Sequence, residues 1–484
     1  MRDTDYDVIV AGGGMAGLIT AASIAEFSKQ NARVLVVDRN SEDEPGKKTS
    51  AGWICGDAVS KNSLDFLAKS TGIVYGRPEI EHEVEGVMVY SPDHSTKVLF
   101  EGAGYILNRK LLPRRQVEDA KKRGVEFQFG VSLESLIAED GYVKGVVGRT
   151  RNNEVFKKTA RVVVDATGSA SLLRVRLPIK AKIQREIDRD DMVATGRYIY
   201  EFDVAEEDPS YFDPKYALIH LDQYLAPGGY AWTFPKGQNK VNIGLGYQKR
   251  ALDARNRRFG KSDGLQDLID EYVAKNRVIR NPRLSSSPDD KGNEKGHWQV
   301  PVRRPNDCMV ANGYAVVGDA AWMPRPIDAG GIGPAIHGSL ILGRTVAEAL
   351  EAGDVSEAGL WKYNVEFMRT YGYQMASFEV LRRYLQTLPN EDIDFGMRYF
   401  LSQEDIGLIT HRRHPKFSNL LNPALMVRVM EKPGLARGLK YTVDKSEKLI
   451  AHNQNYPETP QKFDEWQKAL LKELQETYIK FGLA

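Results

Sequence analysis

Three glycines near the start of the chain have the spacing of a dinucleotide-binding turn. Gly12, Gly14 and Gly17 form the pattern G-x-G-x-x-G, and Asp38 follows 21 residues after the last of them. The glycines permit a tight turn, backbone approach to a pyrophosphate and close helix packing, and the helix amides bind the pyrophosphate. The carboxylate of Asp38 would accept hydrogen bonds from the hydroxyls of the adenosine ribose. We therefore expect dinucleotide binding by Gly12, Gly14, Met15, Ala16, Gly17, Asp38 and Arg39.

An aromatic segment much later in the chain has the types of side chain that suit an apolar ligand. It is Tyr-Ala-Trp-Thr-Phe-Pro at 230–235, and after eight residues Gly244-Leu245-Gly246 follow. In a strand, Tyr230, Trp232 and Phe234 share one face. Such a face fits the wall of a cavity for hydrocarbon, where binding gains about 25 cal/mol per Å² of buried apolar surface. A sheet face packed on an ordinary core helix has the same spacing.

Two further predicted strands end in residues that could contact a cofactor. Val162–Val164 runs into Asp165-Ala166-Thr167-Gly168, and Tyr314–Val317 runs into Gly318-Asp319. Both strand ends resemble motifs of the FAD-binding superfamily that includes para-hydroxybenzoate hydroxylase. Members of this superfamily carry an ATG-type strand end and a later GD motif. The resemblance implies FAD, near Gly168 and Asp319. An ionised carboxylate also suits the ribityl hydroxyls of a flavin.

A glycine turn and an arginine complete the expected cofactor site. Gly331, Ile332 and Gly333 precede a predicted helix, whose amides would stabilise the negative charge near N1 of a reduced flavin. An Asp N-cap and an ordinary glycine turn are the alternative. Arg109 resembles the arginine that these flavoproteins place near the cofactor, although a solvated surface charge is nearly as good an interpretation.

The aromatic segment resembles a signature of one family in this superfamily. Y-x-W-x-F-P followed by G-x-G resembles the signature of geranylgeranyl reductases, and the chain is similar to the archaeal digeranylgeranylglycerophospholipid reductases among them. Cys55-Gly56-Asp57-Ala58 resembles the cysteine-glycine loop that these enzymes place beside the flavin. The resemblance implies that Cys55, Gly56 and Ala58 lie near FAD. It also implies saturation of double bonds in a prenylated lipid or in geranylgeranyl diphosphate.

The residue types fit that chemistry. An isolated alkene has no carbonyl to accept charge, so its reduction needs a hydride from flavin N5 and a proton at the other carbon. A dry pocket protects the resulting cationic centre, which the faces of Tyr230 and Trp232 can stabilise. We expect Cys55, Tyr230, Trp232 and Phe234 to be catalytic. Substrate contacts are expected from Tyr230, Trp232, Phe234, Gly244 and Gly246.

The elements that must position these residues indicate an α/β fold. Tyr6–Ala11, Met15–Lys29 and Arg33–Asp38 predict a strand, a helix and a second strand. We expect a glutathione-reductase-like Rossmann domain for FAD, formed by residues 1–180 and 296–372. An antiparallel substrate-binding sheet is expected at 181–295, and a helical region at 373–484, which ends in an amphipathic helix over Phe463–Phe481.

Composition excludes several classes of function. Lys and Arg number 67 against 65 Asp and Glu, which gives no support to nucleic-acid binding. The start resembles no signal peptide and no window is apolar enough for a membrane span, so we expect a cytoplasmic protein with peripheral contact to the membrane. No metal-ligand spacing and no second dinucleotide turn are present. An external electron donor, NAD(P)H or a ferredoxin, is therefore expected.

Several alternatives stay open at this point. A flavin monooxygenase would share the FAD motifs, whereas a flavin-dependent halogenase would carry W-x-W-x-I-P, which the chain lacks. A non-catalytic carrier of prenyl lipid that retains FAD belongs to a different class. Cys55 and Cys308 are the only cysteines. A disulfide between them is one hypothesis, and a small buried hydrophobic role for Cys55 is another.

Overall fold

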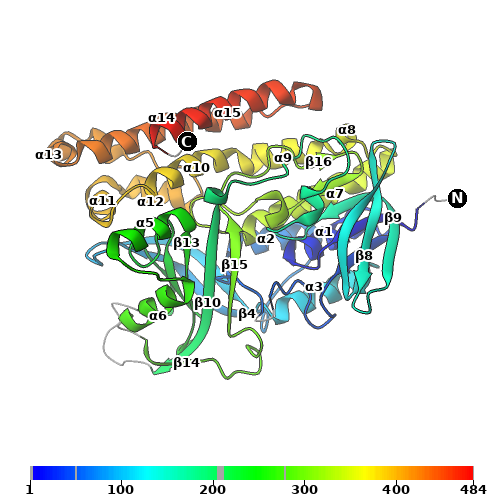
Figure 1. Ribbon diagram of the computed structural model, residues 1–484, viewed down its shortest axis with the longest axis horizontal. Helices are drawn as coiled ribbons and strands as arrows, with labels where there is room; N and C mark the ends of the chain where they lie inside the picture. Colours follow the sequence, from blue (N-terminus) through cyan, green and yellow to red (C-terminus); the bar gives the residue numbers. More distant parts are fainter. Residues whose placement is uncertain (1–3, 50–51, 204–211, 277–278, 483–484) are drawn as a thin grey trace.

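The protein contains two β-sheets beside each other and a layer of C-terminal helices that runs across both (Figure 1). The computed structural model describes residues 4–49, 52–203, 212–276 and 279–482. The Rossmann-type α/β architecture with a second sheet and a C-terminal helical region is confirmed.

The first sheet is built on the βαβ unit that the sequence predicts. β1 (Tyr6–Ala11) pairs in parallel with β2 (Val34–Asp38) and β9 (Val155–Asp165), and α1 (Met15–Phe27) connects β1 to β2. β1 and β2 are buried almost throughout, as strands covered on both faces must be. The order is β16-β17-β9-β1-β2-β6, with β8 on β9 and β7 on β8. The other strands are β6 (Glu126–Phe129), β7 (Val131–Glu139), β8 (Tyr142–Thr150), β16 (Val310–Ala311) and β17 (Tyr314–Val316).

Helices cover this sheet and bring the ends of distant segments together. α1 packs against α3 (Leu111–Lys121) and α7 (Ile332–Ala352), and α7 also contacts α2 (Lys61–Thr71) and α9 (Lys362–Thr370). The approach of α7 to α1 is close, because a Cβ on Gly343 would lie 2.4 Å from Ser23 Cβ. The N-termini of α1 and α7 are thereby held at the same edge of the sheet.

The second sheet carries the aromatic segment. Its order is β14-β10-β13-β12-β11-β4-β5-β3, with β15 also on β10. From the predicted substrate domain come β10 (Met192–Asp203), β11 (Tyr216–His220), β12 (Ala231–Pro235), β13 (Lys240–Gln248), β14 (Arg280–Leu284) and β15 (Lys295–Pro301). One face is covered by α6 (Leu265–Lys275), which packs on β10 and β13, and α5 (Lys249–Phe259) also contacts β13.

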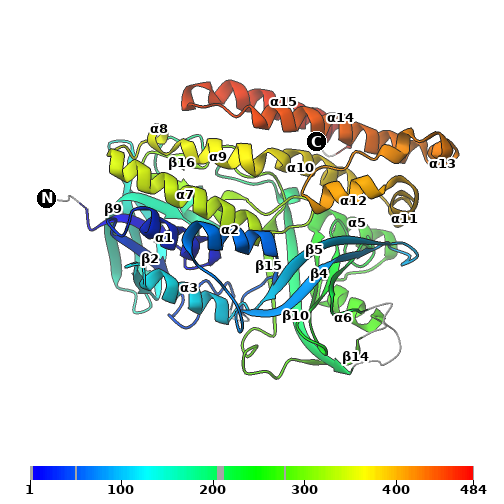
Figure 2. The same ribbon diagram turned by 180° about the vertical axis from the view of Figure 1, so that it is seen from behind.

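Three strands of this sheet come from a much earlier part of the chain. β3 (Ala58–Ser60), β4 (Ile80–Tyr90) and β5 (Lys97–Leu107) lie within residues 1–180, which the sequence assigns to the FAD-binding domain. β4 pairs in parallel with β11. It pairs antiparallel with β5, beside which it lies in Figure 2. The predicted boundary at residue 180 therefore needs correction, because an early hairpin completes the later sheet, which is mixed rather than purely antiparallel.

The C-terminal region is helical, as predicted, and packs along the edge of the molecule. It contains α10 (Met375–Leu385), α11 (Asn390–Phe395), α12 (Gln403–Thr410), α13 (Met426–Glu431), α14 (Pro433–Gln454) and α15 (Phe463–Lys480). In Figure 1, α14 and α15 lie above α9 and α10. α14 contacts α9, α10 and α15, so the terminal helices are part of the same fold.

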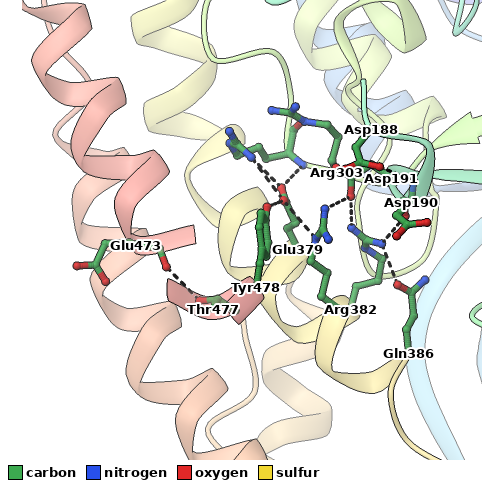
Figure 3. A network of polar contacts seen from close by, with 12 residues as sticks. Asp188, Asp190, Asp191, Arg303, Glu379, Arg382, Gln386, Glu473, Thr477 and Tyr478 are labelled. Carbon is green, nitrogen blue, oxygen red and sulfur yellow. Dashed lines mark hydrogen bonds and ion pairs between the residues drawn. The ribbon is translucent and has the colours of Figure 1, made fainter. Parts of the chain in front are cut away.

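A buried ionic network ties α10 and α15 to the second sheet (Figure 3). Glu379 on α10 accepts from the backbone amide of Arg304 at 2.9 Å and from the Tyr478 hydroxyl on α15. Arg382 and Arg383 each lie 2.6 Å from Asp191, next to the start of β10. Burial raises the pKa of Glu379, but the surrounding arginines outweigh it and hold this pKa well below its usual range.

Replacement of Glu379 by glutamine should destabilise the fold by about 3–5 kcal/mol, because it removes one carboxylate from a buried cluster of arginines in which Asp191 and Asp307 remain. Folding lowers the pKa of Glu379. The stability that its carboxylate contributes is therefore complete above the unfolded-state pKa of about 4.3, and it is lost as the pH falls from there toward the folded-state pKa. Urea unfolding of wild type and E379Q from pH 7 to pH 3 measures both effects. A constant difference between the two proteins over this range would contradict the assignment.

Candidate active site

The predicted glycine turn adopts the conformation that a pyrophosphate site needs. Gly12 has φ +104°, and a Cβ there would lie 2.5 Å from the carbonyl oxygen of Ala166. A Cβ on Gly17 would lie 2.0 Å from Gly12 O, whereas one on Gly14 would meet nothing within 4 Å. Gly14 precedes α1, and no side chain in the described part of the protein caps this helix, so its first amides can donate to an anion.

Asp38 supports the glycine turn, whereas Arg39 contacts a neighbouring loop. One Asp38 oxygen accepts from Gly13 N at 2.5 Å, and the other accepts from Asn40 N at 2.7 Å. Arg39 donates to the carbonyl of Lys48 at 2.7 Å. Neither side chain lines the cavity described below. In this structure Asp38 fixes the turn, and its contact with a ribose stays a prediction.

One continuous cavity joins the glycine turn to the second sheet. Of the predicted cofactor residues, those that line it are Gly14, Met15, Ala16, Cys55, Gly56, Arg109, Gly168, Asp319, Gly331 and Ile332. Residues that lie outside its lining are Gly12, Gly17, Asp38, Arg39, Ala58 and Gly333. Ala58 is exposed on β3, and a Cβ on Gly333 would lie 3.0 Å from Ser63 Oγ.

Charged groups at the cofactor end of this cavity are poised for a polar ligand. Asp319 follows β17 in a short helical turn, and its Oδ2 lies 3.0 Å from Lys48 Nζ. Arg109 Nη1 approaches Met15 Sδ at 3.8 Å, while its Nε is buried without a hydrogen-bond partner among the described residues. A buried, unpartnered guanidinium nitrogen beside uncapped helix amides fits the phosphates of a dinucleotide.

The aromatic residues form the opposite end of the same cavity. Tyr230 precedes β12, and Trp232 and Phe234 lie on it, with ring centroids 6.1 Å and 6.2 Å apart along the row. All three line the cavity. Ala231 and Thr233 lie on the other face, where Thr233 Oγ1 is 2.9 Å from the Tyr272 hydroxyl. The predicted alternation is confirmed, and the aromatic face borders a cavity as well as packing on apolar neighbours such as Val84 and Ile106.

The predicted G-x-G glycines have two different positions. Gly246 lines the cavity, whereas Gly244 lies beneath the indole of Trp232. A Cβ on Gly244 would come within 2.5 Å of Trp232 Cζ2 and 2.3 Å of Gly196 O. Gly244 thus makes room for the Trp232 ring, and in this structure it acts on the cavity only through that ring.

The loop that carries Cys55 is held against the aromatic residues by buried polar contacts. Asn242 on β13 donates to Cys55 O and to Asp57 Oδ2, each at 2.8 Å, and accepts from Trp232 Nε1 at 3.0 Å. Buried Lys236 lies 3.1 Å from the same Asp57 oxygen. Cys55 Sγ accepts from Asp57 N at 3.2 Å, and burial raises the pKa of its thiol despite the nearby Arg109. The thiol is therefore protonated at neutral pH.

Residues that the sequence did not single out complete the cavity wall. Lys48 faces Asp319, and Arg382, Gln386 and Gln223 line the end that is closed by the C-terminal helices. Gln386 donates to Gly228 O at 2.6 Å, which joins α10 to the loop before β12. None of these has a local sequence signal, because each acquires its position from a distant segment.

Comparison with known proteins gives a consistent result for both sheets. The family model described as FAD dependent oxidoreductase matches residues 7–191, and that of the geranylgeranyl reductase catalytic domain matches residues 197–281. The digeranylgeranylglycerophospholipid reductase of Sulfolobus acidocaldarius is 33% identical over 472 residues, which cover 97% of each chain. The chain belongs to the geranylgeranyl reductase family. It is an FAD-dependent oxidoreductase, and FAD is its cofactor.

Other relatives of this geranylgeranyl reductase family member agree. The digeranylgeranylglycerophospholipid reductase of Methanothrix thermoacetophila is 27% identical and covers 87% of this chain and 97% of its own. A solved geranylgeranyl bacteriochlorophyll reductase-like protein from Thermoplasma acidophilum superposes with a TM-score of 0.70 at 23% identity, covering 90% of this chain and 99% of its own. A myxobacterial chondrochloren halogenase, with a TM-score of 0.63 at 18% identity and coverage of 90% and 97%, shares the fold.

The two cysteines of this family member are separate. Cys55 and Cys308 are both free thiols, so the disulfide hypothesis is wrong for this structure. Cys308 is buried in the core of the first sheet, where its Sγ donates to Val310 O at 3.3 Å, and burial raises its pKa to about 12. None of the helices in the described part of the chain combines the length and apolar content that a bilayer crossing requires.

Proposed function

We propose that this protein saturates isolated carbon–carbon double bonds in geranylgeranyl chains of membrane lipid precursors. The observation that carries the proposal is one cavity that has a dinucleotide site at one end and an aromatic wall at the other. Membership in the geranylgeranyl reductase family supports the same conclusion. An apolar wall next to Asp319 and Gly14 suits a substrate whose reacting part is hydrocarbon.

The residues that line the cavity have different roles in the proposed reaction. When bound and reduced, FAD supplies a hydride to one carbon of the alkene. Cys55 Sγ holds the proton that the other carbon receives, because its raised pKa keeps the thiol protonated. Protonation of that carbon leaves positive charge at the carbon that accepts the hydride; the faces of Trp232 and Tyr230 stabilise this charge, and Trp232 and Phe234 exclude water from the cavity.

The cofactor end is assigned to the glycine turn, Arg109 and Asp319, and the substrate end to the second sheet. In our proposal residues 1–180 and 296–372 hold FAD, except that β3, β4 and β5 belong to the substrate-binding sheet of residues 181–295. The C-terminal helices from residue 373 close the far end through Arg382 and Gln386. An external donor, NAD(P)H or a ferredoxin, returns the electrons, and the substrate is a prenylated lipid or geranylgeranyl diphosphate.

The decisive experiment is a single turnover under nitrogen. Purified protein with reduced FAD is mixed with geranylgeranyl phospholipid, and mass spectrometry follows gains of two hydrogens per double bond while absorbance follows flavin oxidation. Both signals should appear together. Flavin that stays reduced would favour a non-catalytic carrier, and a hydroxylated product formed only with oxygen would favour a monooxygenase.

Replacement of Asp319 by alanine should weaken FAD binding by about 10- to 100-fold, because a charged acceptor for flavin hydroxyls contributes about 1.5–3 kcal/mol. Flavin fluorescence in a titration of apoprotein measures the change. Lys48→Met is the matched control, since it breaks the Lys48–Asp319 ion pair without removing the carboxylate. An equal loss in both variants would assign the effect to the ion pair.

A further inference from the structure

The C-terminal region exposes a compact group of large apolar side chains. Leu421, Met426, Val427 and Met430 are 77%, 46%, 68% and 75% exposed, and we call them the apolar tip. Three of them lie on α13 at positions i, i+1 and i+4, which share one face of a helix. Val429, on an adjoining side of α13, packs against a buried cluster. Three residues of α13 thus present an apolar surface to solvent, while Val429 anchors the helix to the rest of the protein.

Basic residues surround the apolar tip along the chain. Residues 411–440 contain seven Lys or Arg and one Glu, whereas the whole chain has a net charge of only +2. The rest of the protein is therefore net negative. Some of these cations have exposed acidic partners, such as Glu404 for Lys416 and Glu431 for Arg428, and exposed pairs are weak. Arg413 and Arg437 are exposed as well.

The apolar tip is connected to the cavity through packed side chains. Leu420 and Val429, which neighbour residues of the apolar tip in the sequence, pack against the buried cluster under α13. The same cluster includes four residues that line the cavity, namely Leu221, Ile327, Leu385 and Ile393. A continuous apolar interior therefore extends from the substrate end of the cavity to the base of the tip. In Figures 1 and 2, α13 lies at one end of the molecule, away from β8 and β9.

We propose that the apolar tip docks the protein on an anionic lipid surface. Exposed Leu, Met and Val beside Lys and Arg are the combination that inserts into the headgroup region and binds negative lipids. A second copy of the chain fits less well, because a symmetric contact would bring two basic segments together. The choice of a lipid partner rests on the proposed function, and docking here presents the cavity to a membrane that holds the substrate.

Vesicle sedimentation of the FAD-loaded protein tests the docking surface. Wild type should bind vesicles of equal parts phosphatidylglycerol and phosphatidylcholine and should bind pure phosphatidylcholine weakly. The triple variant L421S/V427S/M430S should lose binding by roughly tenfold or more, since it removes the inserted apolar area. R413Q/R437Q should reduce binding to the anionic vesicles only. The matched control V74S/V155S changes valines that are 65% and 69% exposed elsewhere, and should bind like wild type.

Turnover of detergent-dispersed geranylgeranyl phospholipid separates docking from the proposed function. The triple variant should retain wild-type turnover in detergent and lose it only for substrate embedded in vesicles. Equal vesicle binding by wild type and triple variant would overturn the docking surface even if turnover is normal. A change of oligomeric state in the triple variant without loss of vesicle binding would assign the tip to a second copy and also overturn it. Vesicle binding without any turnover would leave docking intact and contradict the proposed function.

Discussion

Cys55→Ala should slow double-bond reduction by about 100-fold or more while FAD remains bound. A positioned general acid contributes about 10²–10⁴-fold, and alanine leaves no group to hold the proton at this place. The glycine turn and Asp319, which we propose hold FAD, are not altered by the change. Single-turnover oxidation of the reduced flavin by geranylgeranyl phospholipid measures the rate, and the visible spectrum reports the bound cofactor.

The pH dependence distinguishes a proton donor from a residue that only shapes the pocket. Because the thiol is the active form and its pKa is raised, the wild-type rate should persist through neutral pH and fall only above the ordinary thiol range of about 8.5. Cys308→Ala is the matched control, because Cys308 is buried in the core of the first sheet. This substitution should leave both the rate and its pH profile unchanged. A Cys55→Ala rate equal to that of wild type would remove Cys55 from the mechanism.

Trp232→Ala should lower kcat/KM for a geranylgeranyl lipid by about 100-fold, with FAD still bound. The indole forms the middle of the aromatic wall, and its loss admits water and removes the face that stabilises positive charge. The vacated volume should also cost about 3–5 kcal/mol of stability. Turnover is therefore compared at a temperature where circular dichroism shows both proteins folded.

Trp232→Phe separates the two roles of the indole. Phenylalanine keeps an aromatic face but cannot donate a hydrogen bond to Asn242. In the wild-type protein, Asn242 Oδ1 accepts a hydrogen bond from Trp232 Nε1 at 3.0 Å. We expect this variant to retain most of the reduction and to lose part of the stability. Equal turnover of the alanine variant and wild type would show that the wall is only a packed sheet face.

The cofactor turn could be predicted from the sequence because its chemistry is local. The three glycines lie within six residues, and β1 and α1 have nearly the predicted bounds. The alternation of Tyr230, Trp232 and Phe234 is equally local, since it follows from strand geometry alone. Family resemblance added the cofactor and the substrate class, which spacing alone leaves open.

Contacts between distant segments could not be predicted. Lys48 and Asp319 meet across 271 positions, and Asn242 reaches the Cys55 loop across 187. Their types are common on any protein surface, so only the folded chain distinguishes them. Gly244 illustrates the same limit: the sequence marks it as important, but the reason, which is the Trp232 ring above it, appears only in three dimensions.

The parallel pairing of β4 with β11 limits how this enzyme can be divided into fragments that fold independently. A fragment confined to 181–295 would leave the backbone of Tyr216–His220 unpaired along one side, and an apolar strand with open donors and acceptors is a template for aggregation. Transfer of the second sheet into another flavoprotein therefore requires grafting two separate stretches of the chain at once. Modular exchange of this sheet between proteins is correspondingly difficult.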